Sequence, residues 1–76
     1  MDYKKNETYT INRSVYVYKA PFITASHALK TPYWKNRKVK CYGTLSDPDG
    51  NIWMRVISQQ TFRYIPAIYK GEVIIQ

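Results

Sequence analysis

The feature that most restricts the fold of this 76-residue chain is a tight turn followed directly by an alternating segment. Residues 47–51 read Asp-Pro-Asp-Gly-Asn. Proline fixes φ at the second position of a turn, and Gly or Asn accepts the positive φ that a sharp reversal requires. Residues 52–56 then alternate, which predicts a half-buried β-strand. One face of this strand would carry Ile52, Met54 and Val56, and the other Trp53 and Arg55.

Short alternating segments separated by turn residues recur along the chain and predict further strands. We expect strands over residues 9–11, 14–19, 39–42, 44–46, 52–58, 62–65 and 72–76. Gly43 would bend the chain, and Pro66 would end its strand. The segments that read as loops or turns are residues 23–30 (which can hold one helical turn at 26–29), 31–38 and 67–71 (a turn or a single tight helical turn). The spacing predicts an all-β fold, a small barrel of short antiparallel strands.

The length of the chain permits one small domain with a modest core. Residues 1–8 are polar and read as a linker or frayed amino terminus, so the domain would occupy residues 9–76. No apolar run approaches the roughly 20 residues that span a bilayer, so no membrane partner is expected. The amino end also lacks the apolar stretch of a signal peptide, which predicts that the protein is made in the cytoplasm.

The single cysteine and the single histidine offer little reactive chemistry. Cys41 lies on the inward side of its predicted strand with Val39, where a buried and inert thiol is expected. A reactive pair of Cys41 and His27 is the alternative, but no third group that would orient it is in view. His27 has no companion cluster of metal ligands, so no metal and no cofactor are predicted. We therefore expect a binding domain rather than an enzyme.

The charge and the aromatic content predict an anionic partner and a wet binding face. The net charge is +7, and eight of the aromatic residues are tyrosines, which combine an apolar ring with a polar tip. The anionic partners that suit this charge are nucleic acid, anionic lipid and wall polymers rich in phosphate or carboxylate. The basic residues of one predicted loop and strand are either a solvated face or a site for teichoic-acid phosphate: Lys35, Arg37, Lys38 and Lys40.

Two motifs in fixed order resemble the bacterial SH3 domain. Residues 49–53 read Asp-Gly-Asn-Ile-Trp, and residues 63–66 read Arg-Tyr-Ile-Pro. They are similar to the branch found at the carboxyl end of peptidoglycan hydrolases, in lysostaphin-type bacteriocins and in endolysins of phages of Gram-positive bacteria. The likeness covers residues 9–76 and implies an SH3-like barrel that binds the cell wall without catalysing a reaction. Residues 44–46 lack the acidic and methionine side chains of the members that bind pentaglycine, which leaves the type of wall open.

The resemblance and the alternation together predict the ligand-binding residues. The resemblance implies that Tyr64 contacts wall peptide, and that the segment before the Asp-Gly turn also touches ligand. Trp53 reads either as a stacking floor or as partial core packing, and Tyr33 and Trp34 lie in a basic loop that suits a sugar or peptide. The full predicted set is Tyr64, Trp53, Tyr33, Trp34, Tyr16, Tyr18, Tyr42, Thr44, Ser46 and Arg63.

The expected function is therefore to target a peptidoglycan hydrolase to a Gram-positive wall. The partners would be peptidoglycan peptide or teichoic acid, and the catalytic domain of the hydrolase. The apolar last strand also allows association between copies of the chain. A nucleic-acid-binding β-barrel is the alternative, since a basic face rich in tyrosine can stack bases, but the glycine-rich loops that would strengthen it are missing.

Overall fold

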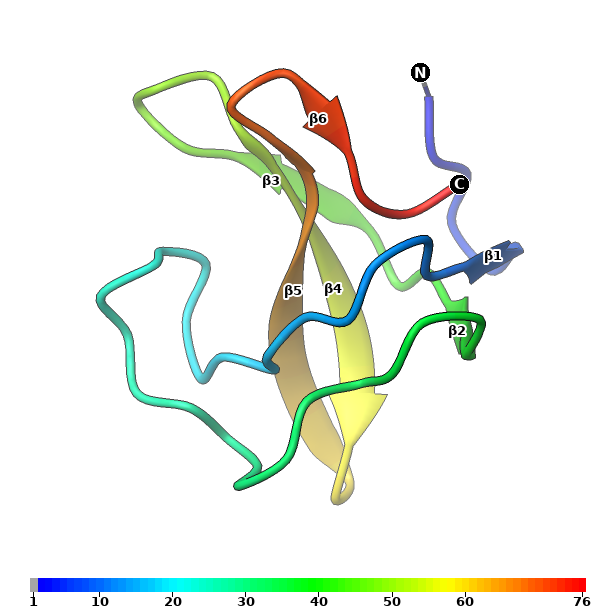
Figure 1. Cartoon of the computed structure of the whole chain (residues 1–76), viewed down its shortest axis with the longest axis vertical. Helices are drawn as coiled ribbons and strands as arrows, with labels where there is room; N and C mark the ends of the chain where they lie inside the picture. The colour runs from blue at the N-terminus through cyan, green and yellow to red at the C-terminus, as the bar shows by residue number, and fades with distance from the viewer. Residues whose placement is uncertain (1) are drawn as a thin grey trace.

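The turn and strand that dominate the sequence form the centre of the fold. In the computed structural model, which describes residues 2–76, β4 (Ile52–Ser58) and β5 (Thr61–Tyr69) make a long antiparallel hairpin across the middle of the molecule (Figure 1). The prediction of a strand over residues 52–58 is confirmed, and a two-residue connection joins it to β5.

The strands form two antiparallel sheets. The larger has the order β3-β4-β5-β6, with β3 at Thr44–Ser46 and β6 at Glu72–Val73. The smaller pairs β1 (Thr8–Thr10) with β2 (Lys38–Lys40). The all-β prediction is confirmed, and residues 2–76 contain no helix. The helical turn expected at 26–29 is absent, whereas the predicted turn at 67–71 is present at residues 70–71, after the end of β5. Among residues 2–76 the paired strands form these two sheets, and isolated β-bridges such as Ile11–Ile75 link them.

Gly43 lies between β2 and β3 and lets residues 38–46 contribute one strand to each sheet. Its φ is +124°, in a region that L side chains rarely adopt. Tyr42 N donates to Arg55 O (2.8 Å), and Arg55 N donates to Gly43 O (2.9 Å), so two residues lie opposite one, as in a β-bulge. The predicted bend at Gly43 is confirmed, and it turns the chain from β2 into β3.

Backbone pairing at the carboxyl end also joins the two sheets. Thr10 and Gln76 each donate a backbone N–H to the other's carbonyl, and Ile11 forms a β-bridge with Ile75. The apolar end of the chain therefore has a pairing partner within the same chain.

The hydrophobic core lies between the two sheets and follows the predicted alternation. Val15 and Val17 are buried, as are Met54 and Val56 of β4. Cys41 is fully buried, which confirms the expected environment of this thiol. Ile11, Ile65, Ala67, Ile74 and Ile75 complete the centre of the core.

Two of the predicted strands differ from the structure. Residues 14–19 make only isolated bridges, at Val15 and Tyr18, because the chain bends away after each short contact.

Pro66 does not end its strand, because β5 continues to Tyr69. The register shifts by one residue beside Pro66, between the partners of Ile52 and Trp53, and such an irregularity tolerates a residue without an N–H.

The amino-terminal segment makes contacts with the rest of the domain. The ring of Tyr3 packs edge-on against Tyr9 at 5.2 Å, and its hydroxyl donates to Ile75 O. Burial, with smaller contributions from Tyr9 and Cys41, raises the pKa of Tyr3. Residue 1, which belongs to the segment expected to be a linker or frayed end, lies outside the described residues.

The carboxylate of Asp47 organises the turn between β3 and β4. Its Oδ1 accepts from the backbone N–H groups of Asp49 (2.9 Å) and Asn51 (3.0 Å). Its Oδ2 accepts from Asn51 Nδ2 (3.0 Å) and from Trp53 Nε1 (3.1 Å). Desolvation raises the pKa of Asp47, but these hydrogen bonds outweigh it and hold the pKa below its usual value.

The stability of the fold should therefore depend on the ionisation of Asp47. Because its pKa is lower in the folded state, the carboxylate stabilises the fold fully above its ordinary pKa of about 3.9. This contribution is lost as the pH falls through the folded-state value. We expect Asp47→Asn to lower the melting temperature at pH 7, and the difference from the parent to narrow below about pH 4.

Thermal unfolding followed by circular dichroism across this pH range measures both effects. Asp49→Asn is the matched control, since Asp49 is exposed in the same turn and has the same charge. The stabilising role of the Asp47 carboxylate would be contradicted if Asp49→Asn lowered the melting temperature as much as Asp47→Asn. It would also be contradicted if the difference in melting temperature between Asp47→Asn and the parent stayed constant with pH.

Candidate functional site

The sheet face that points away from the core carries a continuous set of aromatic and cationic side chains. Arg55 pairs across the strands with Tyr64, and Ile57 with Phe62, so these side chains share one face. Tyr18 adds to the same face through its β-bridge with Tyr64. The members of this outer face that carry rings or charge are Tyr18, Tyr42, Trp53, Arg55, Phe62 and Tyr64.

Arg55 lies at the centre of the outer face, among aromatic rings. Its guanidinium carbon is 5.0 Å from the ring centroid of Phe62 and 5.7 Å from that of Tyr64. Tyr42 lies beside Phe62, with ring centroids 6.4 Å apart. Cation–π attraction at these distances holds the guanidinium over the rings. Arg55 Nε is buried and has no hydrogen-bond partner among the described residues.

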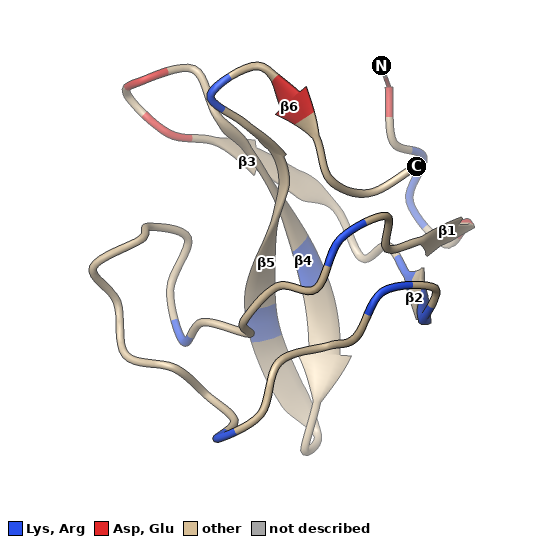
Figure 2. Ribbon diagram, viewed as in Figure 1, with Lys and Arg blue, Asp and Glu red and all other residues tan. Residues whose placement is uncertain are grey.

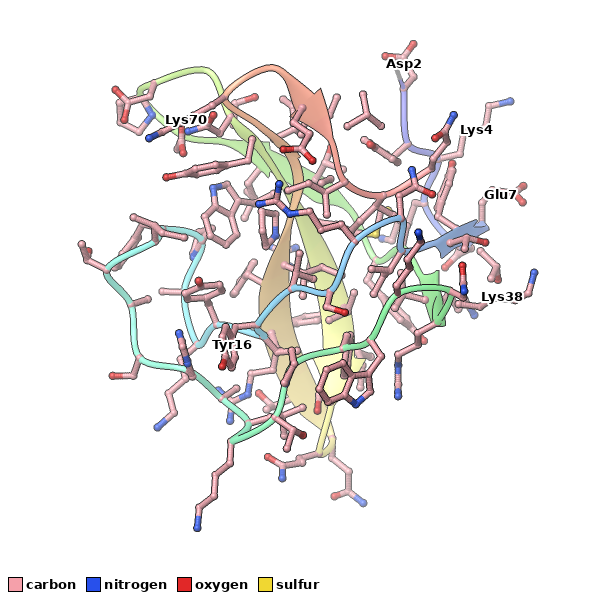
Figure 3. All side chains as sticks on the ribbon, viewed as in Figure 1. Asp2, Lys4, Glu7, Tyr16, Lys38 and Lys70 are labelled. Atoms are coloured by element: carbon pink, nitrogen blue, oxygen red, sulfur yellow. The ribbon has the colours of Figure 1, made fainter. Side chains whose placement is uncertain are left out.

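A groove of about 190 Å³ opens at one end of the outer face, and we call it the tyrosine groove. It lies between the chain after β1, the following loop and the end of β5. Its principal lining residues are Arg13, Tyr16, Tyr18, Ile23, Pro66 and Tyr69. Tyr16, labelled in Figure 3, is 42% exposed and stacks on His27 with ring centroids 4.2 Å apart. The groove thus offers ring surface with polar phenol tips, as binding clefts commonly do.

Trp53 and Tyr18 are more buried than the sequence predicts. Trp53 is fully buried, with edge-to-face contacts to Tyr18 (5.3 Å) and Tyr69 (6.4 Å). Tyr18 is only 7% exposed because the loop after it folds back and places His27 against its ring. Of the two alternatives for Trp53, core packing is confirmed, whereas the alternation of residues 14–19 wrongly predicts an outward position for Tyr18. Trp53 supports the groove from beneath, whereas Tyr18 lines it.

The pKa of the Tyr18 phenol reflects this enclosed setting. Burial, with smaller contributions from the neighbouring phenols of Tyr69 and Tyr16, raises the pKa above its usual value. The phenol therefore stays protonated at neutral pH and keeps an O–H donor at the groove.

The structure brings half of the predicted site residues onto the outer face or the groove, and places the others elsewhere. Tyr33 is buried beneath Arg37, whose guanidinium carbon is 4.0 Å from its ring centroid. Trp34 is 64% exposed and does not line the tyrosine groove. Thr44, Ser46 and Arg63 pair with Met54, Ile52 and Val56, so they lie on the opposite face from Tyr64.

Several residues of this site were not predicted. Arg55 and Phe62 share the alternation of Trp53 and Tyr64, so the period of the strands could have identified them. Tyr69 and Ile23 carry no local signal, because only the folded chain brings them beside Tyr16.

Acidic and basic side chains are unevenly distributed around these features. Figure 2 shows Asp and Glu at the turn between β3 and β4 and at β6, whereas β2 and the segment before it carry Lys and Arg. In residues 2–76 the one ion pair joins Arg13 at the groove to Glu72 of β6.

Within the described part of the chain, no group of three or more His, Cys, Asp or Glu side chains could hold a metal ion. No helix there is long and apolar enough to cross a membrane. Cys41 is buried, whereas His27 is exposed and stacked on Tyr16. Comparison with protein-family models, curated proteins and solved structures finds no match to this chain.

The two tryptophans should differ sharply in their effect on stability. We expect Trp53→Ala to lower the free energy of unfolding by about 3–5 kcal/mol, because it leaves a cavity between Tyr18 and Tyr69. Trp34→Ala, at an exposed position, should change it by no more than about 0.5 kcal/mol. Urea denaturation measures both, and Trp53→Phe provides a milder variant if Trp53→Ala does not fold. Equal costs at the two positions would contradict the burial of Trp53.

Proposed function

We propose that this domain is a non-catalytic module that binds the Gram-positive cell wall through the tyrosine groove and the adjoining outer face. The observation that carries the proposal is the meeting of rings from separate parts of the chain. Tyr16 and Tyr18 follow β1, Tyr64 lies in the middle of β5 and Tyr69 at its end. Ring surface with polar tips suits a ligand that alternates apolar and polar groups, as wall peptides and glycans do.

The resemblance of the sequence motifs to bacterial SH3 domains is a separate argument for the same proposal. It assigns wall-peptide contact to Tyr64, and Tyr64 borders Tyr18 on the outer face. The groove holds only about 190 Å³, so binding through it would be modest for each contact. A module of this kind would act by tethering, since it raises the concentration of a linked peptidoglycan hydrolase at its substrate. The hydrolase would be a phage endolysin or a bacteriolysin, acting at the wall.

Single-stranded nucleic acid is the second candidate, and the cluster around Arg55 is the observation that favours it. The rings of Phe62 and Tyr64 lie beside one guanidinium on the outer face of a domain with a net charge of +7. Bases stack on such rings while cations hold the phosphates. Binding of this type weakens steeply with added salt, whereas groove binding of wall peptide should not.

The wall-binding proposal predicts that Tyr16→Ala and Tyr64→Ala each weaken binding to purified Gram-positive sacculi by about tenfold, the usual effect of removing an anchoring aromatic residue. Phe22→Ala is the matched control, because Phe22 is also an exposed aromatic residue near the groove but does not line it. Co-sedimentation of labelled protein with sacculi from walls of several cross-bridge types measures the affinities, and circular dichroism checks that each variant is folded.

Parallel binding to single-stranded oligonucleotides separates the two candidate functions. Saturable retention by sacculi at raised salt supports wall binding. Retention by oligonucleotides alone, lost at raised salt, would overturn it in favour of the second candidate.

A further inference from the structure

A second cavity, distinct from the tyrosine groove, is lined by three cations. It has a volume of about 150 Å³ and lies at the edge formed by β2 and β4. Arg37, Lys38 and Lys40 line it together with the rings of Tyr33 and Tyr42, and we call it the cationic pocket. A water molecule needs only about 10–15 Å³ of such space, so the pocket has room for a tetrahedral oxyanion with part of its hydration shell.

The positive charge of the cationic pocket is not neutralised within the described residues. No Asp or Glu lines the pocket, and the one ion pair of residues 2–76 lies elsewhere, between Arg13 and Glu72. Figure 3 shows Lys38 pointing outward, with Glu7 on the same side of the molecule. Like charges held together in a concave site raise the local concentration of an anion.

Aromatic rings hold two of these cations in place. The guanidinium carbon of Arg37 is 4.0 Å from the ring centroid of Tyr33, and Lys40 Nζ is 5.4 Å from that of Tyr42. Cations positioned in this way lose less side-chain freedom when an anion binds. Arg also offers a planar fork of donors that matches phosphate oxygens, and Lys adds point charges.

We infer that the cationic pocket binds the phosphate group of a phosphodiester-linked polyol polymer. The identity of the polymer rests on the proposed wall-binding function, whereas the phosphate site follows from the pocket itself. Three cations around one concavity suit a phosphate more closely than a single planar carboxylate, which one Arg fork would satisfy. Val39 and Val56 form the buried base of the lining, and the exposed side chain of Ile57 can contact the carbon chain between phosphates.

The pocket fits a polyol phosphate better than a nucleic acid. A base needs an open ring face on which to stack. Tyr33 is only 7% exposed and is covered by Arg37, while Tyr42 has Lys40 over its ring and Phe62 beside it. The rings of the cationic pocket therefore position cations and leave little surface for a base.

Nuclear magnetic resonance titrations test the phosphate site directly. We expect inorganic phosphate and short poly(glycerol phosphate), at ionic strength held constant with sodium chloride, to cause saturable shifts at the backbone amides of residues 37–42. Lys38→Gln/Lys40→Gln should weaken the binding by about tenfold, since it removes two of three cations. Lys19→Gln/Lys30→Gln is the matched control, because it removes the same charge from two exposed positions outside the pocket. The phosphate site would be overturned if the two double variants weakened phosphate binding equally. It would also be overturned if the chemical-shift changes were spread evenly over all lysines.

A second comparison separates this inference from the proposed function. Sacculi are tested intact and after hydrofluoric acid has removed their phosphodiester-linked polymers. The inference is supported if the parent is retained more weakly on stripped than on intact sacculi, while Lys38→Gln/Lys40→Gln is retained equally on both. Equal retention of the parent on both overturns it and leaves wall binding intact. Saturable phosphate shifts without retention on any sacculi overturn the proposed function and the identity of the polymer, and leave the phosphate site standing. Tighter binding to an oligonucleotide of equal charge, reduced by Lys38→Gln/Lys40→Gln, would reassign the pocket to nucleic acid.

Discussion

The hydrogen bonds of one carboxylate hold together the parts of the chain that build the outer face. Asp47 fixes the turn into β4 and accepts from the indole of Trp53, which positions the largest fully buried side chain of the domain. Asn51, held by the same carboxylate, accepts from Lys70 N (2.8 Å) and so joins this turn to the one between β5 and β6. Because the indole is held at both its ring and its N–H, the tyrosines packed on it have a rigid base.

This arrangement gives the central hairpin two apolar sides, which is unusual for so small a sheet. Antiparallel sheets commonly pack one face and leave the other to water. Here Met54 and Val56 face the core, while Trp53 packs beneath Tyr18 and Tyr69 on the other side. A domain of this length has little core volume, so a second layer of large rings adds buried surface without adding residues. The same layer supplies walls of the tyrosine groove, so stability and the proposed binding would depend on shared side chains.

Local patterns in the sequence predict those parts of the structure that depend on neighbouring residues. The turn at Asp47, the strand that follows it, the bend at Gly43 and the burial of Cys41 all arise from chemistry within a few positions. The enclosure of Tyr18 could not be predicted, since it requires a loop to fold back over a distance that alternation does not describe. The tyrosine groove could be predicted even less, because its lining comes from segments some fifty residues apart that meet only in the folded chain.

The outer face also links the two cavities into one path. Tyr42 lines the cationic pocket and neighbours Phe62, Arg55 spans Phe62 and Tyr64, and Tyr64 bridges to Tyr18 at the tyrosine groove. Each site alone is small and open, so a ligand that filled only one would be held weakly. A polymer that reached both would bind the second site at the high effective concentration set by its own chain, and would gain affinity without any new contact. Under the proposed wall binding, long repeating polymers would therefore be bound more tightly than short fragments that reach only one site.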